Sequence, residues 1–139
     1  MKNKILISLT LLLTNIISVH AEEANSGFRA GPNMAVQEAS LKDGFKLAEK
    51  AKEVIGVKTK TLGAKPYTIP VEALVYYGDK LGVYRLRNGW FKLIEIQKIS
   101  KNNKTISLSS SELTEQDQIA ITGVALLRVS EMDAFGGEQ

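Results

Sequence analysis

Side chains that could carry out chemistry are few in this 139-residue sequence. It contains no cysteine, and its single histidine, His20, lies at the end of an apolar N-terminal stretch. A Ser-His-Asp or Cys-His nucleophile requires an imidazole, and most zinc and copper sites require imidazole or thiolate ligands. The sequence therefore predicts a protein that is not an enzyme and that has no site of these metal classes.

Carboxylates are the remaining reactive groups, and Glu112, Glu115 and Asp117 gather in the segment SSSELTEQDQ. Such a group could bind a hard cation or act as acid and base. The segment lacks the alternating ligands and the internal glycine of a calcium loop. Ser109 and Glu112 instead have the spacing of a capping box, and Leu113 could anchor the turn in the core. We therefore predict a polar turn here, with no metal and no cofactor.

Two methionines, Met34 and Met132, could bind soft copper or silver ions. They lie near opposite ends of the chain, in segments of the kind that is usually exposed, so we predict that they are solvent-exposed and bind nothing. The alternative function is a carrier that captures a metal ion or a small ligand directly. That alternative requires the methionines and the carboxylates to converge in the fold.

A second group of side chains could bind a protein. Aromatic residues surround two predicted turns beside two arginines, and the candidate partner-binding residues are Tyr76, Tyr77, Arg85, Arg87, Trp90 and Phe91. Aromatic and arginine side chains provide much of the binding energy at protein interfaces. The alternative is aromatic pairing across strands in the sheet core, in which case only one of the neighbours Trp90 and Phe91 faces outward.

The N-terminus has the pattern of a secretory signal peptide over residues 1–21. Lys2 and Lys4 precede an apolar run from Ile5 to Val19, and Ala21 follows at a position suited to cleavage. Polar residues interrupt the run, which is shorter than the roughly 20 residues of a spanning helix, and this disfavours a membrane anchor. We expect cleavage and export, with the periplasm of a Gram-negative bacterium as the simplest destination.

Residues 22–139 would then form one domain of near-neutral charge. Lys2 and Lys4 leave with the signal peptide, so 16 of the 18 basic side chains remain against 15 acidic ones. This balance gives no support to nucleic-acid binding. Without cysteine the chain has neither a disulfide nor a lipid-modified cysteine, so its core alone must hold the fold.

The first part of this chain is predicted to be irregular and then helical. Residues 22–44 hold few large apolar side chains, so we predict a flexible leader. Leu47, Ala51, Val54 and Ile55 have helical spacing, and Gly56 follows as a typical helix end. A short strand is expected over residues 57–62, followed by a connection over residues 63–68.

The rest of the sequence predicts a β domain. Strands are expected over residues 69–77, 81–87, 90–100, 105–109 and 119–127, with turns between them. Asn88-Gly89 is the strongest hairpin signal, because both central residues of a type I′ turn need positive φ. We predict a mainly β fold, a compact antiparallel barrel-like or sandwich-like domain over residues 45–130 with one short N-terminal helix. Residues 131–139 are predicted to be a flexible tail.

Several short motifs occur in a recognisable order. The first set is Leu47, Gly56, Val57 and Thr59; the second is Ile69, Pro70, Ala73 and Leu74; the third is Val83, Tyr84 and Ile94-Glu95-Ile96; the last is Leu113, Asp117, Ile119, Ile121 and Gly123. In this order they resemble the C-terminal, membrane-proximal part of periplasmic adaptor subunits (membrane fusion proteins) of RND-type efflux pumps, especially the heavy-metal branch. The resemblance covers residues 45–130, although Glu112 and Gln116 replace two glycines of the family pattern.

This resemblance implies a docking role without catalysis. In the family, this domain packs against the periplasmic portion of the pump. The barrel, lipoyl-like and helical-hairpin domains of a full adaptor would stand between the first two motif sets, which are joined here by residues 63–68. We therefore expect a small periplasmic accessory module that binds a pump or adaptor component and does not bridge two membranes.

Overall fold

The structure is a computed structural model that describes residues 27–137. It is mainly β, with antiparallel sheets arranged as a sandwich, which confirms the predicted fold class; the sheets do not close into a barrel. The strands are β1 (Val36–Ser40), β2 (Gly44–Leu47), β3 (Lys58–Thr61), β4 (Tyr67–Pro70), β5 (Val75–Tyr77), β6 (Lys80–Arg87), β7 (Trp90–Glu95), β8 (Gln97–Lys101), β9 (Thr105–Ser109) and β10 (Gln118–Thr122). The helices are α1 (Glu49–Ile55), the short 3-10 turn η1 (Val71–Ala73) and α2 (Val124–Phe135). Within the described residues, no helix has the length and apolar character needed to cross a bilayer.

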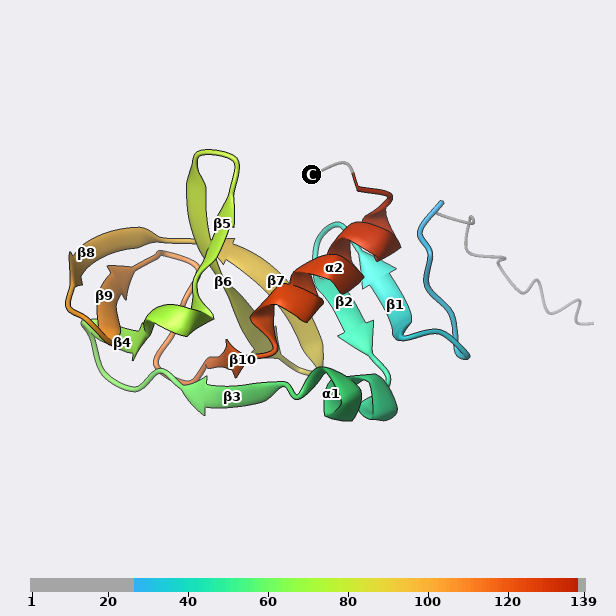
Figure 1. Ribbon diagram of the computed structural model, residues 1–139, viewed down its shortest axis with the longest axis horizontal. Helices are drawn as coiled ribbons and strands as arrows, with labels where there is room; N and C mark the ends of the chain where they lie inside the picture. Colours follow the sequence, from blue (N-terminus) through green and yellow to red (C-terminus); the bar gives the residue numbers. More distant parts are fainter. Residues whose placement is uncertain (1–26, 138–139) are drawn as a thin grey trace, which may run out of the picture.

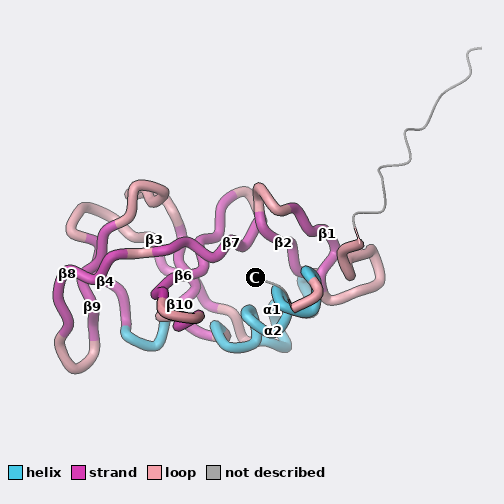
Figure 2. The backbone as a smooth tube through the Cα atoms, turned by 90° about the horizontal axis from the view of Figure 1, so that it is seen from above, coloured by secondary structure: helices cyan, strands magenta, loops and turns pink. Residues whose placement is uncertain are grey.

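The strands form two sheets. The larger sheet has the order β1-β2-β7-β6-β10-β3, with β5 also paired to β6, and the smaller sheet has the order β4-β9-β8. Figure 1 shows the smaller sheet at one end of the molecule and α2 lying across the larger sheet near the other end. In the view from above in Figure 2, both α-helices lie on one side of the molecule.

Two apolar cores lie on opposite faces of the larger sheet. Val83 of β6 and Ile94 of β7 pack against the smaller sheet in the first core, which includes Ile106. Tyr84 of β6 and Phe91 of β7, which point to the opposite face of the same two strands, pack beneath α2 in the second core. Successive side chains of a strand point to opposite faces, so β6 and β7 serve both cores.

The hairpin of β6 and β7 turns at Asn88-Gly89, as predicted. Asn88 has φ 51° and Gly89 has φ 82°, so both central residues are in the left-handed region that a type I′ turn requires. The turn places Arg87 directly opposite Trp90. Local turn chemistry therefore determines which side chains of these two strands face each other.

The predicted flexible leader, residues 22–44, needs correction over residues 27–44, which are ordered; residues 22–26 lie outside the described residues. Residues 36–40 form β1, which pairs with β2 and buries Val36. The Phe28 ring packs on Phe135 with centroids 4.9 Å apart, and the amide of Arg29 donates to the carbonyl of Ala134 at 2.9 Å. β1 is polar because only one of its faces meets the core, so its composition resembles that of a loop.

The C-terminal part also differs from the prediction. The last strand ends at Thr122 instead of Leu127, and α2 follows as a second helix that was not predicted. Residues 131–135 of the predicted flexible tail belong to α2, where Glu131 and Ala134 are buried. Val124, Leu127, Glu131 and Ala134 follow a helical period, but the charged Glu131 interrupts the apolar pattern that normally identifies a buried helix face.

Two predicted strands each contain more than one element, and the first helix begins later than predicted. Residues 69–77 contain the end of β4, the turn η1 and β5, while residues 90–100 contain β7 and most of β8, which belong to different sheets. The predicted helix includes Leu47, but α1 begins at Glu49 because residues 44–47 pair as β2. The predicted signal peptide, residues 1–21, lies outside the described residues.

Candidate interaction site

The β6–β7 hairpin places three of the six candidates, Arg85, Arg87 and Trp90, on one face of the larger sheet. Arg87 lies opposite Trp90, and Arg85 lies opposite Lys92. Directly opposite residues of an antiparallel pair project from the same face. Because Val83 and Ile94 of the same rows pack against the smaller sheet, this face is the one turned away from α2.

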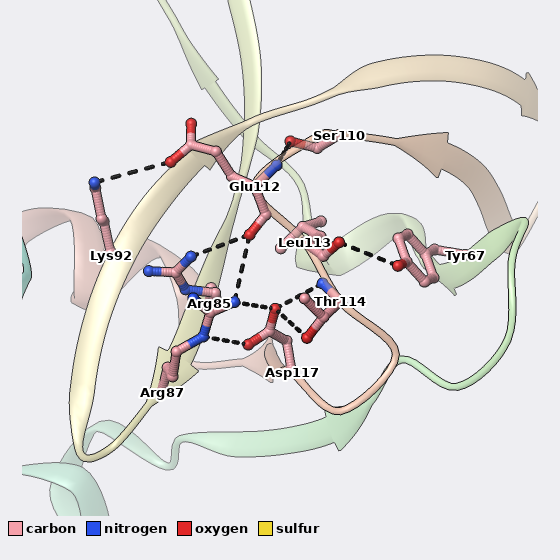
Figure 3. A network of polar contacts seen from close by, with 9 residues as sticks. All are labelled: Tyr67, Arg85, Arg87, Lys92, Ser110, Glu112, Leu113, Thr114 and Asp117. Atoms are coloured by element: carbon pink, nitrogen blue, oxygen red, sulfur yellow. Dashed lines mark hydrogen bonds and ion pairs between the residues drawn. The ribbon is translucent and has the colours of Figure 1, made fainter.

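Arg87 holds the loop of residues 110–117 against this face, as Figure 3 shows. Its Nε and Nη2 atoms each donate to the carboxylate of Asp117 at 2.7 Å, a bidentate ion pair. The Asp117 side chain is only 3% exposed, whereas that of Arg87 is 43% exposed. Burial raises the pKa of the Asp117 carboxyl, but hydrogen bonds from Arg87 and Thr114 outweigh burial and leave this pKa below its usual value.

The loop has further attachments in Figure 3. Arg85 donates from Nη1 to the carbonyl of Glu112 at 3.1 Å, and the Tyr67 hydroxyl donates to the carbonyl of Leu113 at 3.1 Å. The Lys92 ammonium lies 3.9 Å from the Glu112 carboxylate. These contacts connect the loop to both sheets, so the surface beside it is rigidly formed.

The three carboxylates of this segment therefore have different roles. Asp117 also accepts hydrogen bonds from the amide and the hydroxyl of Thr114, which closes the predicted polar turn. The amide of Glu112 donates to the hydroxyl of Ser110, a neighbour of the Ser109 that was predicted to cap it. Glu112 and Glu115 are exposed. Within residues 27–137, no group of three or more carboxylate or imidazole side chains is placed to hold a metal ion.

Trp90 lies at the open end of the same face. It is partly exposed, and the Lys46 ammonium of β2 lies 4.7 Å from the centre of its ring. Lys46 also forms an ion pair with Glu38 of β1 at 2.9 Å. We call Glu38, Lys46, Arg87, Trp90 and Lys92 the open sheet face, because they project from the larger sheet beyond its contact with the smaller sheet.

Phe91 does not belong to this face, which corrects its assignment as a partner-binding residue. It is 1% exposed and lies in the second core, with its ring centroid 6.0 Å from that of Phe45. Tyr84 is also buried there, 6.1 Å from Phe45. Both alternatives for the aromatic residues thus hold in part, since Phe91 and Tyr84 belong to the core and Trp90 faces outward.

Tyr76 and Tyr77 lie elsewhere. β5 pairs with the Lys80 end of β6, whereas Trp90 pairs with Arg87 at the other end. At about 3.4 Å per residue, these ends are on the order of 20 Å apart. Tyr76 is exposed, while Tyr77 is half-buried with the Arg128 guanidinium over its ring. The six candidates therefore do not form one surface.

A buried polar group under α2 was not predicted. The Tyr84 hydroxyl donates to the Glu131 carboxylate at 2.6 Å, and Arg128 donates to the same carboxylate at 2.6 Å. Burial and the charge of Glu131 raise the pKa of the Tyr84 phenol, which keeps it protonated. These hydrogen bonds compensate the buried charge of Glu131, which α2 places in the second core.

An apolar groove between α1 and α2 was also not predicted. It has a volume of about 480 Å³, and its walls include Met34, Val54, Leu126 and Val129. All four side chains are among the large apolar residues that remain exposed. The spacing of Leu126 and Val129 could have indicated an apolar helix face, but the segment was interpreted as a strand.

Comparisons with protein families, with characterised proteins and with solved structures find no match to this chain.

Proposed function

We propose that this chain is a small non-catalytic docking module of the cell envelope. Its partner is a pump or adaptor component of an RND-type, heavy-metal efflux system, as the resemblance of residues 45–130 implies. The predicted signal peptide supports a periplasmic location for this role. The observation that carries the proposal is the open sheet face, where Trp90 stands partly exposed beside Lys46.

The contacts of Trp90 and Arg87 form this surface before any partner binds. Tryptophan and arginine are the side chains most often found at the energetic centre of interfaces. Lys46 positions the Trp90 ring, and the Arg87–Asp117 pair fixes the strand beside it. A side chain that is already ordered loses little conformational entropy on binding, so more of its contact energy contributes to affinity.

The test is photo-crosslinking in the native cell envelope. A photoreactive residue at Glu38, which is exposed beside Lys46, should capture a pump or adaptor component. The same residue at Tyr76 is the control, because Tyr76 is exposed on the distant β5. Trp90→Ala should reduce capture from position 38 by tenfold or more, whereas Tyr76→Ala should leave it unchanged. Arg87 is left intact, because its loss would release the loop of residues 110–117.

Two outcomes would overturn the proposal. Equal capture from positions 38 and 76 would mean that the open sheet face has no special role. Capture of no envelope protein, together with binding of copper, silver or a hard cation in a calorimetric titration of the purified protein, would favour the carrier alternative. Asp117 is already engaged by Arg87 and Thr114, so the carrier alternative has one carboxylate fewer to draw on.

A further inference from the structure

The α1–α2 groove brings several exposed apolar side chains together. Val54 is 77% exposed and Val129 is 60% exposed, and Met34 and Leu126 complete the apolar walls. Both helices lie on the same side of the molecule in Figure 2. Exposed apolar side chains gathered around one groove are typical of an interaction surface.

The charges of α2 are arranged so that its outward side is neutral. Arg128 and Glu131 are paired with each other beneath the helix, and Asp133 is paired with Arg29 at 2.6 Å. The exposed residues between them, Leu126, Val129 and Met132, carry no charge. A surface that meets its own image across a two-fold axis must not repel itself, and this one satisfies that condition.

The charges of α1 add a complementary pair. Glu49 and Lys52 form an ion pair within the helix at 2.6 Å. Lys50 and Glu53 are exposed, have opposite signs and form no ion pair within residues 27–137. Lys50 also lines the groove. In a two-fold arrangement, Lys50 of each copy can meet Glu53 of the other, so the same contact forms twice.

We propose that a second copy of this chain covers the groove, giving a two-fold dimer through α1 and α2. Helices of 7 and 12 residues measure about 10 Å and 18 Å, so the contact buries less surface than a typical stable dimer and belongs to the weak class. We therefore expect a weak dimer that dissociates on dilution. This inference goes beyond the proposed function, because the groove and the open sheet face lie on opposite faces of the larger sheet.

The test is sedimentation equilibrium across a dilution series, using protein expressed from the full-length sequence. The wild type should be dimeric at high concentration and should dissociate on dilution. Val54→Glu should weaken dimerisation by at least tenfold. Leu41→Glu is the matched control, because Leu41 is 75% exposed but lies in the turn between β1 and β2. It should dimerise as the wild type does.

Charge-reversal variants distinguish a loss of dimerisation at this interface from a loss of folding. Lys50→Glu alone and Glu53→Lys alone should each weaken dimerisation, because like charges then meet across the axis. The double variant should restore it, with circular dichroism unchanged throughout. A wild type that is monomeric at every concentration would overturn the proposal, as would equal effects of Val54→Glu and Leu41→Glu. Neither result would affect crosslinking at position 38.

Discussion

Arg87 and Asp117 show how one pair of side chains can organise a surface. The two residues lie on β6 and on the loop before β10, and their bidentate ion pair holds that loop beside Trp90. Asp117 is almost fully buried while Arg87 remains half-exposed. Removing the acid would therefore leave a cation that water can still reach, which limits the energetic penalty.

Asp117→Asn should lower the free energy of unfolding at neutral pH by about 1–3 kcal/mol. The folded-state pKa of Asp117 is depressed, so its contribution is fully present above the unfolded value of about 3.9 and is lost as pH falls through the lower folded value. Urea titrations at neutral pH and near pH 3 would measure this. The difference between wild type and Asp117→Asn should shrink in acid. Glu115→Gln, at an exposed site, should have little effect at either pH.

Residue types alone could not reveal this pair. Alternation in β6 and β7 predicts that Trp90 and Phe91 face opposite ways, but not which of them meets the core, because that depends on where α2 packs. Arg87 and Asp117 are 30 residues apart, and their contact depends on the path of the intervening chain. Local chemistry was sufficient at Asn88-Gly89, where the turn depends only on the conformational freedom of two adjacent residues.

Among the secondary-structure elements, β2 and β7 approach each other closely because residue 44 is a glycine. Phe45 pairs with Phe91 across these strands. Gly44 has φ 98°, and a Cβ atom there would lie 2.0 Å from the carbonyl oxygen of Phe91. No larger residue fits without separating the strands. Lys46, which positions Trp90, depends on the same approach.

Gly44→Ala should destabilise the fold by about 3 kcal/mol or more, because it combines a steric clash with an unfavourable φ. Gly63→Ala is the matched control, since Gly63 also has a positive φ of 74° but its Cβ would meet open space. Urea unfolding of both variants would separate backbone strain from the clash. Equal losses would show that strand separation contributes nothing.

The second helix was missed for a different reason. Its outward side carries Leu126, Val129 and Met132, while its inward side includes Glu131. Because apolar residues lie on both sides of the helix, no polar face marks a helical period, and the apolar run up to Leu127 was interpreted as the end of a strand. Contacts with Tyr84 and Arg128 satisfy Glu131, and those contacts depend on tertiary structure.

At the scale of the whole molecule, the larger sheet joins two cores into one unit. β6 and β7 supply Val83 and Ile94 to one core and Tyr84 and Phe91 to the other. If β6 and β7 separate from one core, the apolar side chains of the other core also become exposed to water. The two ends of the molecule should therefore unfold together, as expected for a small single domain.

Ile106→Ala in the first core and Leu127→Ala in the second should each lower the free energy of unfolding by about 2–5 kcal/mol. Both residues are almost completely buried. Each variant should show one urea transition with a lower midpoint and an unchanged slope, because the same surface is exposed on unfolding. A biphasic transition in either variant would contradict this coupling.

The contact of residues 28–29 with the end of α2 has a consequence for chain connectivity. Arg29 bonds to Ala134 and Phe28 packs on Phe135, so the two ends of the described fold meet. Because these ends are close in space, a short linker could join residue 137 to residue 27. New termini opened at Asn102-Asn103, in the exposed turn between β8 and β9, would then give a circular permutant in which both α-helices lie in the interior of the chain.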